Sequence, residues 1–233
     1  MLKNNNKSVI KAYNNQNVVK KMYMNNNVVF QYNELPQGYQ QCKYIQTTGS
    51  QYIATDFIPN NYNGNFTVVM DIQGVEDLDS AAYLCGCGGS NRCCNFRVMN
   101  GMNIQIYNNS TAETPSAATV VSLTATEADI LNRNIFKIIL RDEDVTTLIK
   151  DGIEYSRGNI SRTNGTSRFV IGRSSGTNYP VKIFDWKFYD VSDNLVRHFI
   201  PCLDDNNVPC MYESVNQTTF YNTGTGTFLY ELL

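Results

Sequence analysis

The acidic residues of the chain are the first candidates for chemistry. Enzymes that cleave a glycosidic bond use two carboxyl groups that flank the bond, and acids two residues apart on one strand point to the same face. No Glu-x-Asp-x-Glu run occurs in the 233 residues, and the nearest acidic cluster, Glu76-Asp77-x-Asp79, follows Gly74 in a predicted loop. The sequence therefore lacks the paired carboxylates of a glycosidase.

A serine or cysteine activated by histidine is the second possibility. Such a nucleophile needs a base within hydrogen-bond reach. His198 is the only histidine, and it lies in the apolar run Leu195–Ile200 with no evident partner in the sequence. Together with the missing carboxylate pair, this predicts that the protein is not an enzyme.

The cysteines could bind a metal or form disulfides. The seven are Cys42, Cys85, Cys87, Cys93, Cys94, Cys202 and Cys210. The spacing Cys85-x-Cys87-x₅-Cys93-Cys94 does not fit structural zinc sites, in which cysteines are separated by about two to four residues. The first 30 residues also lack the apolar run of a secretory signal, so we expect folding in a cytoplasm, where thiols stay reduced. We predict buried thiols, no metal and no cofactor.

Two polar loops could bind ions, and the sequence favours a structural role for both. The segment Pro201–Cys210 contains Asp204 and Asp205, whose oxygens could hold Ca²⁺, although a solvated turn is the simpler alternative. The segment Thr223–Thr227 alternates Thr and Gly but lacks the Lys-Ser/Thr of a phosphate loop. Its glycines are predicted to let the last strand pass close to its neighbour.

Two further features could bind a sugar. Phe184, Trp186 and Phe188 alternate with Asp185 and Lys187, so the three rings are predicted to share one face of a strand. Such a row can stack on a pyranose, but we favour a buried core position for it. Polar loop side chains could instead hydrogen-bond sugar hydroxyls. The candidates are Asn159, Asn164, Ser174, Ser175, Asn178 and Tyr179.

Strands must position these residues, because the chain shows almost no helical period. Short β-rich runs separated by turn signals continue from Cys42 to Tyr221, and Asp151-Gly152 marks the clearest hairpin. Such a succession predicts an all-β sandwich or jelly roll. Pro36 and Gly38 interrupt any regular element, so we predict two domains, residues 1–34 and residues 35–233.

The first 34 residues repeat a pattern of Lys, Tyr, Asn and Val at an offset of ten. The runs Ser8–Tyr13, Val18–Met24 and Val28–Tyr32 predict a three-stranded meander, which is at best marginally stable alone. Residues 1–33 carry five lysines and no acid, whereas the chain as a whole has a net charge of −2. We therefore predict an anchor or oligomerisation segment that meets an acidic surface. The residues expected to contribute are Lys11, Tyr13, Val18, Lys21, Tyr23, Val28 and Phe30.

Several segments of the chain together resemble a recurrent module of bacteriophage structural proteins. They are Leu35–Ala54 (LPQGYQQCKYIQTTGSQYIA) with Thr55-Asp56 and Pro59, Phe169–Gly172, Lys182–Asp190 (KIFDWKFYD) and Leu195–Leu229. The order LVR-x-FIPC, CMY, FYNTGTGTF in the last segment is the most specific part. His198 stands where the family usually has an acidic residue. The resemblance covers nearly all of residues 35–233 and implies a concanavalin A-like, laminin G-like jelly roll.

The resemblance also implies a function. It points to a structural component of a tailed phage virion, displayed on the capsid as a head fibre or decoration protein, or on the tail. The expected partners are other virion proteins, copies of the same chain and a host-surface glycan. A carbohydrate-binding, lectin-like module of a host or phage adhesion protein is the alternative. Nucleic acid is not expected, because the basic segment contains no Arg, and neither is a membrane, because no run approaches the about 20 apolar residues of a span.

Overall fold

The computed structural model describes most of the chain after Leu35 and short pieces before it. The described residues are 13–14, 17–18, 21–24, 27–31, 35–76, 81–87, 95–99, 104–107, 121–124, 126, 129–141, 145–159, 167–173 and 178–233. The chain divides into two compact units, Met1–Gln37 and Gly38–Leu233. No helix in these ranges is both long enough and apolar enough to cross a bilayer.

The first unit contains two hairpins, which differ from the predicted three-stranded meander. β1 (Tyr13–Asn14) pairs with β2 (Asn17–Val18), and β3 (Lys21–Met24) pairs with β4 (Asn27–Gln31), all antiparallel. The predicted central strand, Val18–Met24, is thus divided between the two hairpins. Each copy of the ten-residue repeat therefore pairs its strands within itself.

The second unit contains a large antiparallel sheet. Its strand order is β14-β13-β12-β7-β16-β5-β17-β18-β19, and β20 pairs with β5. The strands are β5 (Gln40–Gln46), β7 (Phe66–Gly74), β12 (Asn134–Arg141), β13 (Val145–Lys150), β14 (Ile153–Asn159), β16 (Val181–Tyr189), β17 (Leu195–Leu203), β18 (Pro209–Glu213), β19 (Thr218–Phe220) and β20 (Leu229–Leu232). Asp151 and Gly152 form the turn between β13 and β14, both with positive φ, as the sequence predicts.

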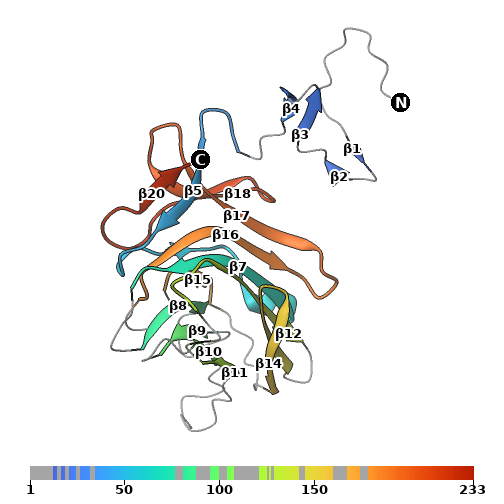
Figure 1. The fold of residues 1–233 in the computed structure, drawn as a ribbon, viewed down its shortest axis with the longest axis vertical. Helices are drawn as coiled ribbons and strands as arrows, with labels where there is room; N and C mark the ends of the chain where they lie inside the picture. Colours follow the sequence, from blue (N-terminus) through green and yellow to red (C-terminus); the bar gives the residue numbers. More distant parts are fainter. Residues whose placement is uncertain are drawn as a thin grey trace. The chain divides into compact units, whose positions relative to one another are not determined.

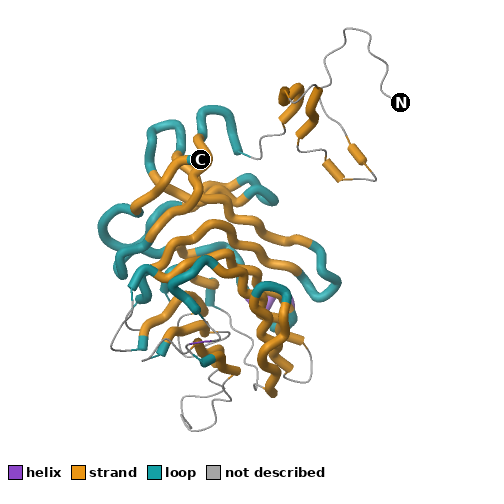
Figure 2. The backbone as a smooth tube through the Cα atoms, in the orientation of Figure 1, coloured by secondary structure: helices purple, strands orange, loops and turns teal. Residues whose placement is uncertain are grey.

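A smaller antiparallel sheet packs against one face of the large sheet (Figures 1 and 2). Its order is β11-β10-β9-β8-β15-β6. The strands are β6 (Ile53–Ala54), β8 (Ala82–Cys87), β9 (Asn95–Val98), β10 (Ile104–Tyr107), β11 (Val121–Leu123) and β15 (Phe169–Ile171), and the short 3₁₀ helix η1 spans Pro59–Tyr62. The prediction of an all-β jelly-roll sandwich is confirmed.

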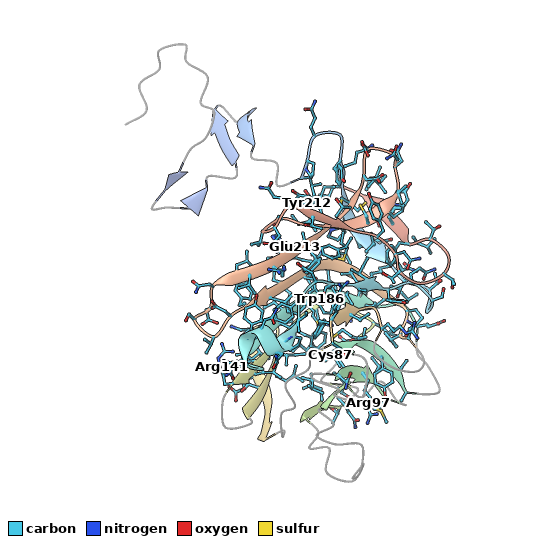
Figure 3. All side chains as sticks on the ribbon, turned by 180° about the vertical axis from the view of Figure 1, so that it is seen from behind. Cys87, Arg97, Arg141, Trp186, Tyr212 and Glu213 are labelled. Carbon is cyan, nitrogen blue, oxygen red and sulfur yellow. The ribbon has the colours of Figure 1, made fainter. Side chains whose placement is uncertain are left out.

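Aromatic side chains fill the space between the sheets. Phe188 stacks on Phe57 with ring centroids 4.2 Å apart and meets the edge of Phe169 at 5.0 Å. Trp186, on the same strand as Phe188, is fully buried inside the sandwich (Figure 3). The predicted core position is therefore confirmed for Trp186 and Phe188. Burying such rings removes large apolar areas from water and provides much of the stability of the sandwich.

The prediction of buried thiols is confirmed for four cysteines and wrong for one. Cys42, Cys85, Cys202 and Cys210 are buried thiols, whereas Cys87 is disulfide-bonded. Cys93 and Cys94 lie outside the described residues. The prediction relied on the expected compartment, whereas a single disulfide depends on whether two cysteines come within bonding distance in the fold.

The glycines of the Thr-Gly-Thr-Gly-Thr segment allow a close backbone contact, as predicted. Thr223 and Thr225 donate backbone hydrogen bonds to Tyr52 O and Ser50 O. A Cβ atom on Gly224 would lie 1.9 Å from Ser50 O. Only glycine can therefore bring the end of the chain this close to the segment before β6.

The variant Gly224→Ala tests this contact. We expect it to lower the free energy of unfolding by about 3 kcal/mol, because a backbone must shift to admit the methyl group. Gly152→Ala is the control: no heavy atom lies within 4 Å of its Cβ position and φ is +84°, so only about 1 kcal/mol of backbone strain is expected. Denaturant unfolding of both variants measures the difference. Equal losses would contradict the role of the Ser50 contact.

Candidate ligand-binding face

The outer face of the large sheet, which points away from the small sheet, carries the candidate site. Because side chains alternate along a strand, the inward Trp186 and Phe188 leave Lys187 and Tyr189 on the outer face. Val69 of β7 lies directly opposite Lys187, and Lys137 of β12 lies opposite Val69 from the other side. Three neighbouring strands therefore bring two lysines and an apolar side chain into one row.

A surface hollow of about 350 Å³ lies on this face, lined by Val69, Lys137, Tyr189 and Asp193. Arg141, at its border, donates from Nη2 to Asp193 Oδ1 at 3.4 Å and to Thr67 Oγ1 at 3.2 Å. The Lys137 ammonium and the Tyr189 hydroxyl have no polar partner in the part of the chain that the structure describes. We call this site the hollow.

His198 lies on the same face and has partners that the sequence analysis did not find. Its Nε2 lies 2.7 Å from Asp185 Oδ1, and its Nδ1 lies 3.4 Å from Ser214 Oγ. Lys187 Nζ donates to Asp185 Oδ2. Burial raises the pKa of Asp185, but the hydrogen bonds and charges of His198 and Lys187 outweigh it and hold the pKa below its usual value. The carboxylate therefore stays ionised between two donors.

The Ser214–His198–Asp185 arrangement has the members of a hydrolytic triad but lacks the surroundings of one. Acyl transfer needs donors for the developing oxyanion. The backbone N–H groups of Val215 and Asn216, which follow Ser214, donate to Glu213, and Ser214 N donates to His198 O. The first two amides are committed to the β18–β19 turn and the third to the pairing of β17 with β18, so the described residues around Ser214 favour a structural role for the histidine.

Two aromatic rings lie farther along the outer face. Phe184 meets the edge of Tyr44 at 5.4 Å, Arg133 Cζ lies 4.0 Å from the Phe184 centroid, and Lys182 Nζ lies 4.6 Å from the Tyr44 centroid. Arg133 also donates two hydrogen bonds of 2.8 Å to Asp71. We call Tyr44 and Phe184 with these two cations the aromatic platform.

The position of Phe184 corrects the prediction that three rings of this strand share one face. The register of β16 with β7 shifts between Ile183 and Asp185, so Phe184 is an extra residue opposite β7. Such a bulge turns the following residues by one position. Phe184 and Asp185 consequently both point outward, whereas Trp186 returns to the core.

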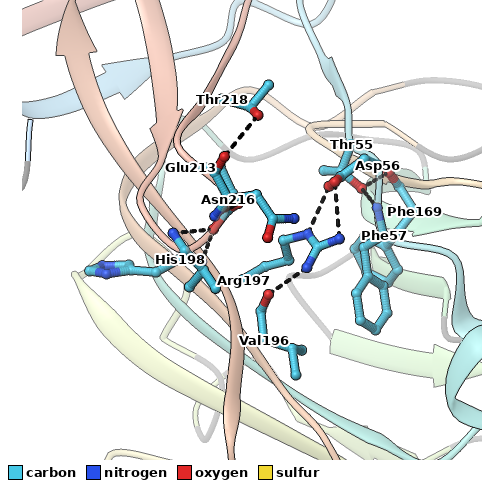
Figure 4. A network of polar contacts seen from close by, with 11 residues as sticks. Thr55, Asp56, Phe57, Phe169, Val196, Arg197, His198, Glu213, Asn216 and Thr218 are labelled. Atoms are coloured by element: carbon cyan, nitrogen blue, oxygen red, sulfur yellow. Dashed lines mark hydrogen bonds and ion pairs between the residues drawn. The ribbon is translucent and has the colours of Figure 1, made fainter. Parts of the chain in front are cut away.

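The motif residues Asp56 and Arg197 pair with each other (Figure 4). Arg197 donates from Nε and Nη2 to the two carboxylate oxygens of Asp56 at 2.9 and 3.0 Å. Glu213, which is fully buried, accepts from the backbone N–H groups of His198, Val215 and Asn216. The Asp56–Arg197 pair connects segments 141 residues apart, and Glu213 connects β17 with the turn after β18. These motif residues therefore belong to the scaffold.

The predicted ligand loops are only partly described. Asn159 ends β14, while Asn164, Ser174 and Ser175 lie outside the described residues. Asn178 donates from Nδ2 to Gly49 O at 3.0 Å. Tyr179 is fully buried and its hydroxyl donates to Glu76 O at 2.7 Å. Tyr179 therefore belongs to the core and presents no surface to a ligand, because its polar end is used within the fold.

The predicted anchor residues lie in the first unit. Tyr13 and Val18 are paired across the first hairpin, Tyr23 and Val28 across the second. Lys21 lies in β3 and Phe30 in β4, while Lys11 lies outside the described residues. Their role in attachment stays a prediction.

The loop considered for calcium uses its carboxylate within the fold. Asp204 is 3% exposed; its Oδ1 accepts from the backbone N–H of Asn206 and Val208, and its Oδ2 accepts from the Tyr221 hydroxyl. Burial raises the pKa of Asp204, but these donors outweigh it and lower the pKa. Within the described residues, no group of three His, Cys, Asp or Glu side chains is placed to hold a metal.

The variant Asp204→Asn tests this structural role. Because one carboxylate oxygen is replaced by an amide donor, we expect the free energy of unfolding at pH 7 to fall by about 2 kcal/mol. A lowered pKa stabilises the fold above the ordinary Asp value of about 3.9 and less below it, so the difference from wild type should shrink as the pH falls below 4. The exposed neighbour Asp205→Asn is the control. A rise in Tm on adding Ca²⁺ to the wild type would favour the metal alternative.

Comparison with known proteins gives likeness of fold only. No family model matches the chain, and no curated protein matches it. The binding domain of botulinum neurotoxin DC in complex with SialylT is 8% identical at a TM-score of 0.48, over 64% of this chain and 40% of that one. The Ruminococcus gnavus IT-sialidase CBM40 is 10% identical at a TM-score of 0.44, over 65% of this chain and 92% of that one. A heptameric SAP-like pentraxin from Limulus polyphemus is 11% identical at a TM-score of 0.46, over 82% of this chain and 89% of that one.

Proposed function

We propose that the sandwich is a binding module that takes up a carbohydrate at the hollow on its outer face. One observation carries the proposal: a lysine ammonium and a tyrosine hydroxyl line the hollow without a polar partner among the described residues. Neither group is among the buried polar atoms that lack a partner, so both are accessible from the hollow and can pair with a ligand that enters it. A sugar suits both, because its hydroxyls accept and donate hydrogen bonds and its CH face packs on an aromatic ring.

The aromatic platform extends the same face. Phe184 and Tyr189 are five residues apart on β16, which at about 3.3 Å per residue separates them by about 16 Å. Both ends offer an aromatic ring with a cation beside it, Arg133 at Phe184 and Lys137 at Tyr189. This supports a chain of several sugar units rather than a single monosaccharide.

Binding to a panel of oligosaccharides tests the proposal. For the best ligand, Tyr189→Ala and Lys137→Gln should each weaken Kd about tenfold, since losing a stacked ring or a charged hydrogen bond costs about 1.4 kcal/mol or more. Titration calorimetry measures the change.

Matched controls point away from the outer face. Tyr230 is 45% exposed and lies opposite the buried Ile45, and Lys150 lies opposite the buried Phe136 and next to Asp151, so Tyr230→Ala and Lys150→Gln should leave Kd unchanged. Absence of binding across the panel, or equal losses in the hollow and control variants, would refute glycan binding at the hollow.

We also propose that the first unit attaches the sandwich to a larger assembly and to copies of itself. What supports this is its separation as a compact unit made of two-stranded hairpins. Hairpins of this size are marginally stable alone, and exposed strand edges gain by pairing with another chain. The sequence resemblance to virion modules names the expected assembly as a tailed phage particle, and the expected location as the virion.

Removing residues 1–34 tests the attachment. We expect the truncated chain to keep the Tm of the sandwich, because its core lies within Gly38–Leu233, and to lose both self-association in light scattering and incorporation into particles. A full-length chain with Tyr23→Ser and Phe30→Ser keeps the length and should show the same losses. If the truncated chain keeps the oligomeric state of the full chain in light scattering and is still incorporated into particles, the proposal is contradicted.

A further inference from the structure

Two buried cysteines face each other across the β17–β18 hairpin. Cys202 and Cys210 are directly opposite in the antiparallel register, and their Sγ atoms lie 3.5 Å apart. Neither side chain has any exposed surface. The two sulfur atoms need to approach by only about 1.5 Å to reach the disulfide bond length of about 2.05 Å.

The backbone of this pair already has the spacing of a disulfide. Ser214 N donates to His198 O and Asp204 N donates to Val208 O, so these two opposed pairs of the hairpin are hydrogen-bonded. Hydrogen-bonded pairs recur at every second position, which includes Cys202 and Cys210, and their Cα atoms are about 5.5 Å apart. Disulfides most often have Cα separations of about 5.5–6 Å. The Cβ atoms of a hydrogen-bonded pair are about 5.5 Å apart, against about 3.5–4.5 Å in a disulfide, so the two strands need only a small approach for the bond to form.

The thiol of Cys42 lies near Cys210, so a bridge between Cys42 and Cys210 is the alternative to one between Cys202 and Cys210. Burial, with a contribution from Cys210, raises the pKa of Cys42 to about 12. The hydrogen bond with Cys202, together with burial, also raises the pKa of Cys210. Since the thiolate is the reactive form, these thiols react slowly in the closed fold, and oxidation requires opening of the hairpin.

We propose that Cys202 and Cys210 form a redox modification site, which a small disulfide oxidises to an intramolecular bridge between β17 and β18. The thiolate of one cysteine attacks the small disulfide and releases its first thiol. The second cysteine then attacks the mixed disulfide and releases the other thiol. The protein loses two protons and two electrons and gains one S–S bond, and the oxidant loses its S–S bond and becomes two thiols.

The bridge would stabilise the half of the sheet that holds the scaffold motif. It closes a short loop around the Asp204 turn, and a cross-link of this kind restricts the unfolded chain. β17 also carries Arg197 and His198, so the same strand would be fixed near both ends. The bridge would stabilise the chain wherever it meets an oxidising environment, and this stabilisation does not depend on the proposed ligand.

Oxidised glutathione is the probe. The full chain is incubated with it in the folded state, and separately refolded from denaturant in its presence, then unfolded, alkylated and mapped by mass spectrometry. In the refolded sample we expect a peptide cross-linked between Cys202 and Cys210, alkylated Cys42 and Cys85, and a rise in Tm of about 5 °C over the reduced protein. In the folded sample the same cross-link should form more slowly. The disulfide of Cys87 is the internal control for the oxidant.

Variants separate this site from general oxidation. Cys202→Ser and Cys210→Ala should each abolish the cross-link and the rise in Tm, while Cys85→Ser should keep both. Because a variant at Cys202 can impair folding, the decisive result is the map of the wild-type chain. Free thiols at Cys202 and Cys210 after refolding, with Cys87 oxidised, or a bridge between Cys42 and Cys210, would overturn the proposal.

Discussion

The structure depends on the burial of the aromatic side chains of β16 against the second sheet. Trp186 and Phe188 are inaccessible to water, and Phe188 contacts Phe57 and Phe169 from the opposite layer. Moving this strand by one residue would expose both rings and bury Lys187, at a cost of many kcal/mol. The register of β16 is therefore fixed by the core. The same register determines which side chains reach the hollow, so the core and the candidate site are specified together.

The bulge in β16 is what joins the hollow to the aromatic platform. Without the extra residue between Ile183 and Trp186, strict alternation would place Phe184 in the core and leave Asp185 alone on the outer face. With it, Phe184 reaches Tyr44 and Arg133, and Asp185 reaches His198. A bulge costs ladder pairing, and in sheets it commonly re-aims a side chain toward a functional surface. Here it re-aims Phe184 and Asp185 toward the outer face.

The sequence predicted what local chemistry determines. The Asp151-Gly152 turn, the close approach at Gly224 and the core position of Trp186 follow from backbone freedom and from alternation. Partners across strands were missed, because they depend on register. His198 and Asp185 are 13 residues apart, Arg197 and Asp56 are 141 apart, and no spacing rule connects them. Tyr179 was misassigned for the same reason: a tyrosine in a polar loop and a tyrosine inserted under Gly74 look alike in sequence.

The motif and the hollow overlap only in part, and this limits what resemblance can say about ligands. Lys187 and Tyr189 belong to the motif segment Lys182–Asp190, whereas Val69, Lys137 and Asp193 come from outside the segments that carry the resemblance. Arg197 and Asp56, which are motif residues, serve the scaffold. The motif therefore accounts for one wall of the hollow. The side chains of β7, β12 and the β16–β17 turn complete it, and because these side chains point away from the core, substitutions there would change the lining of the hollow while leaving the fold intact.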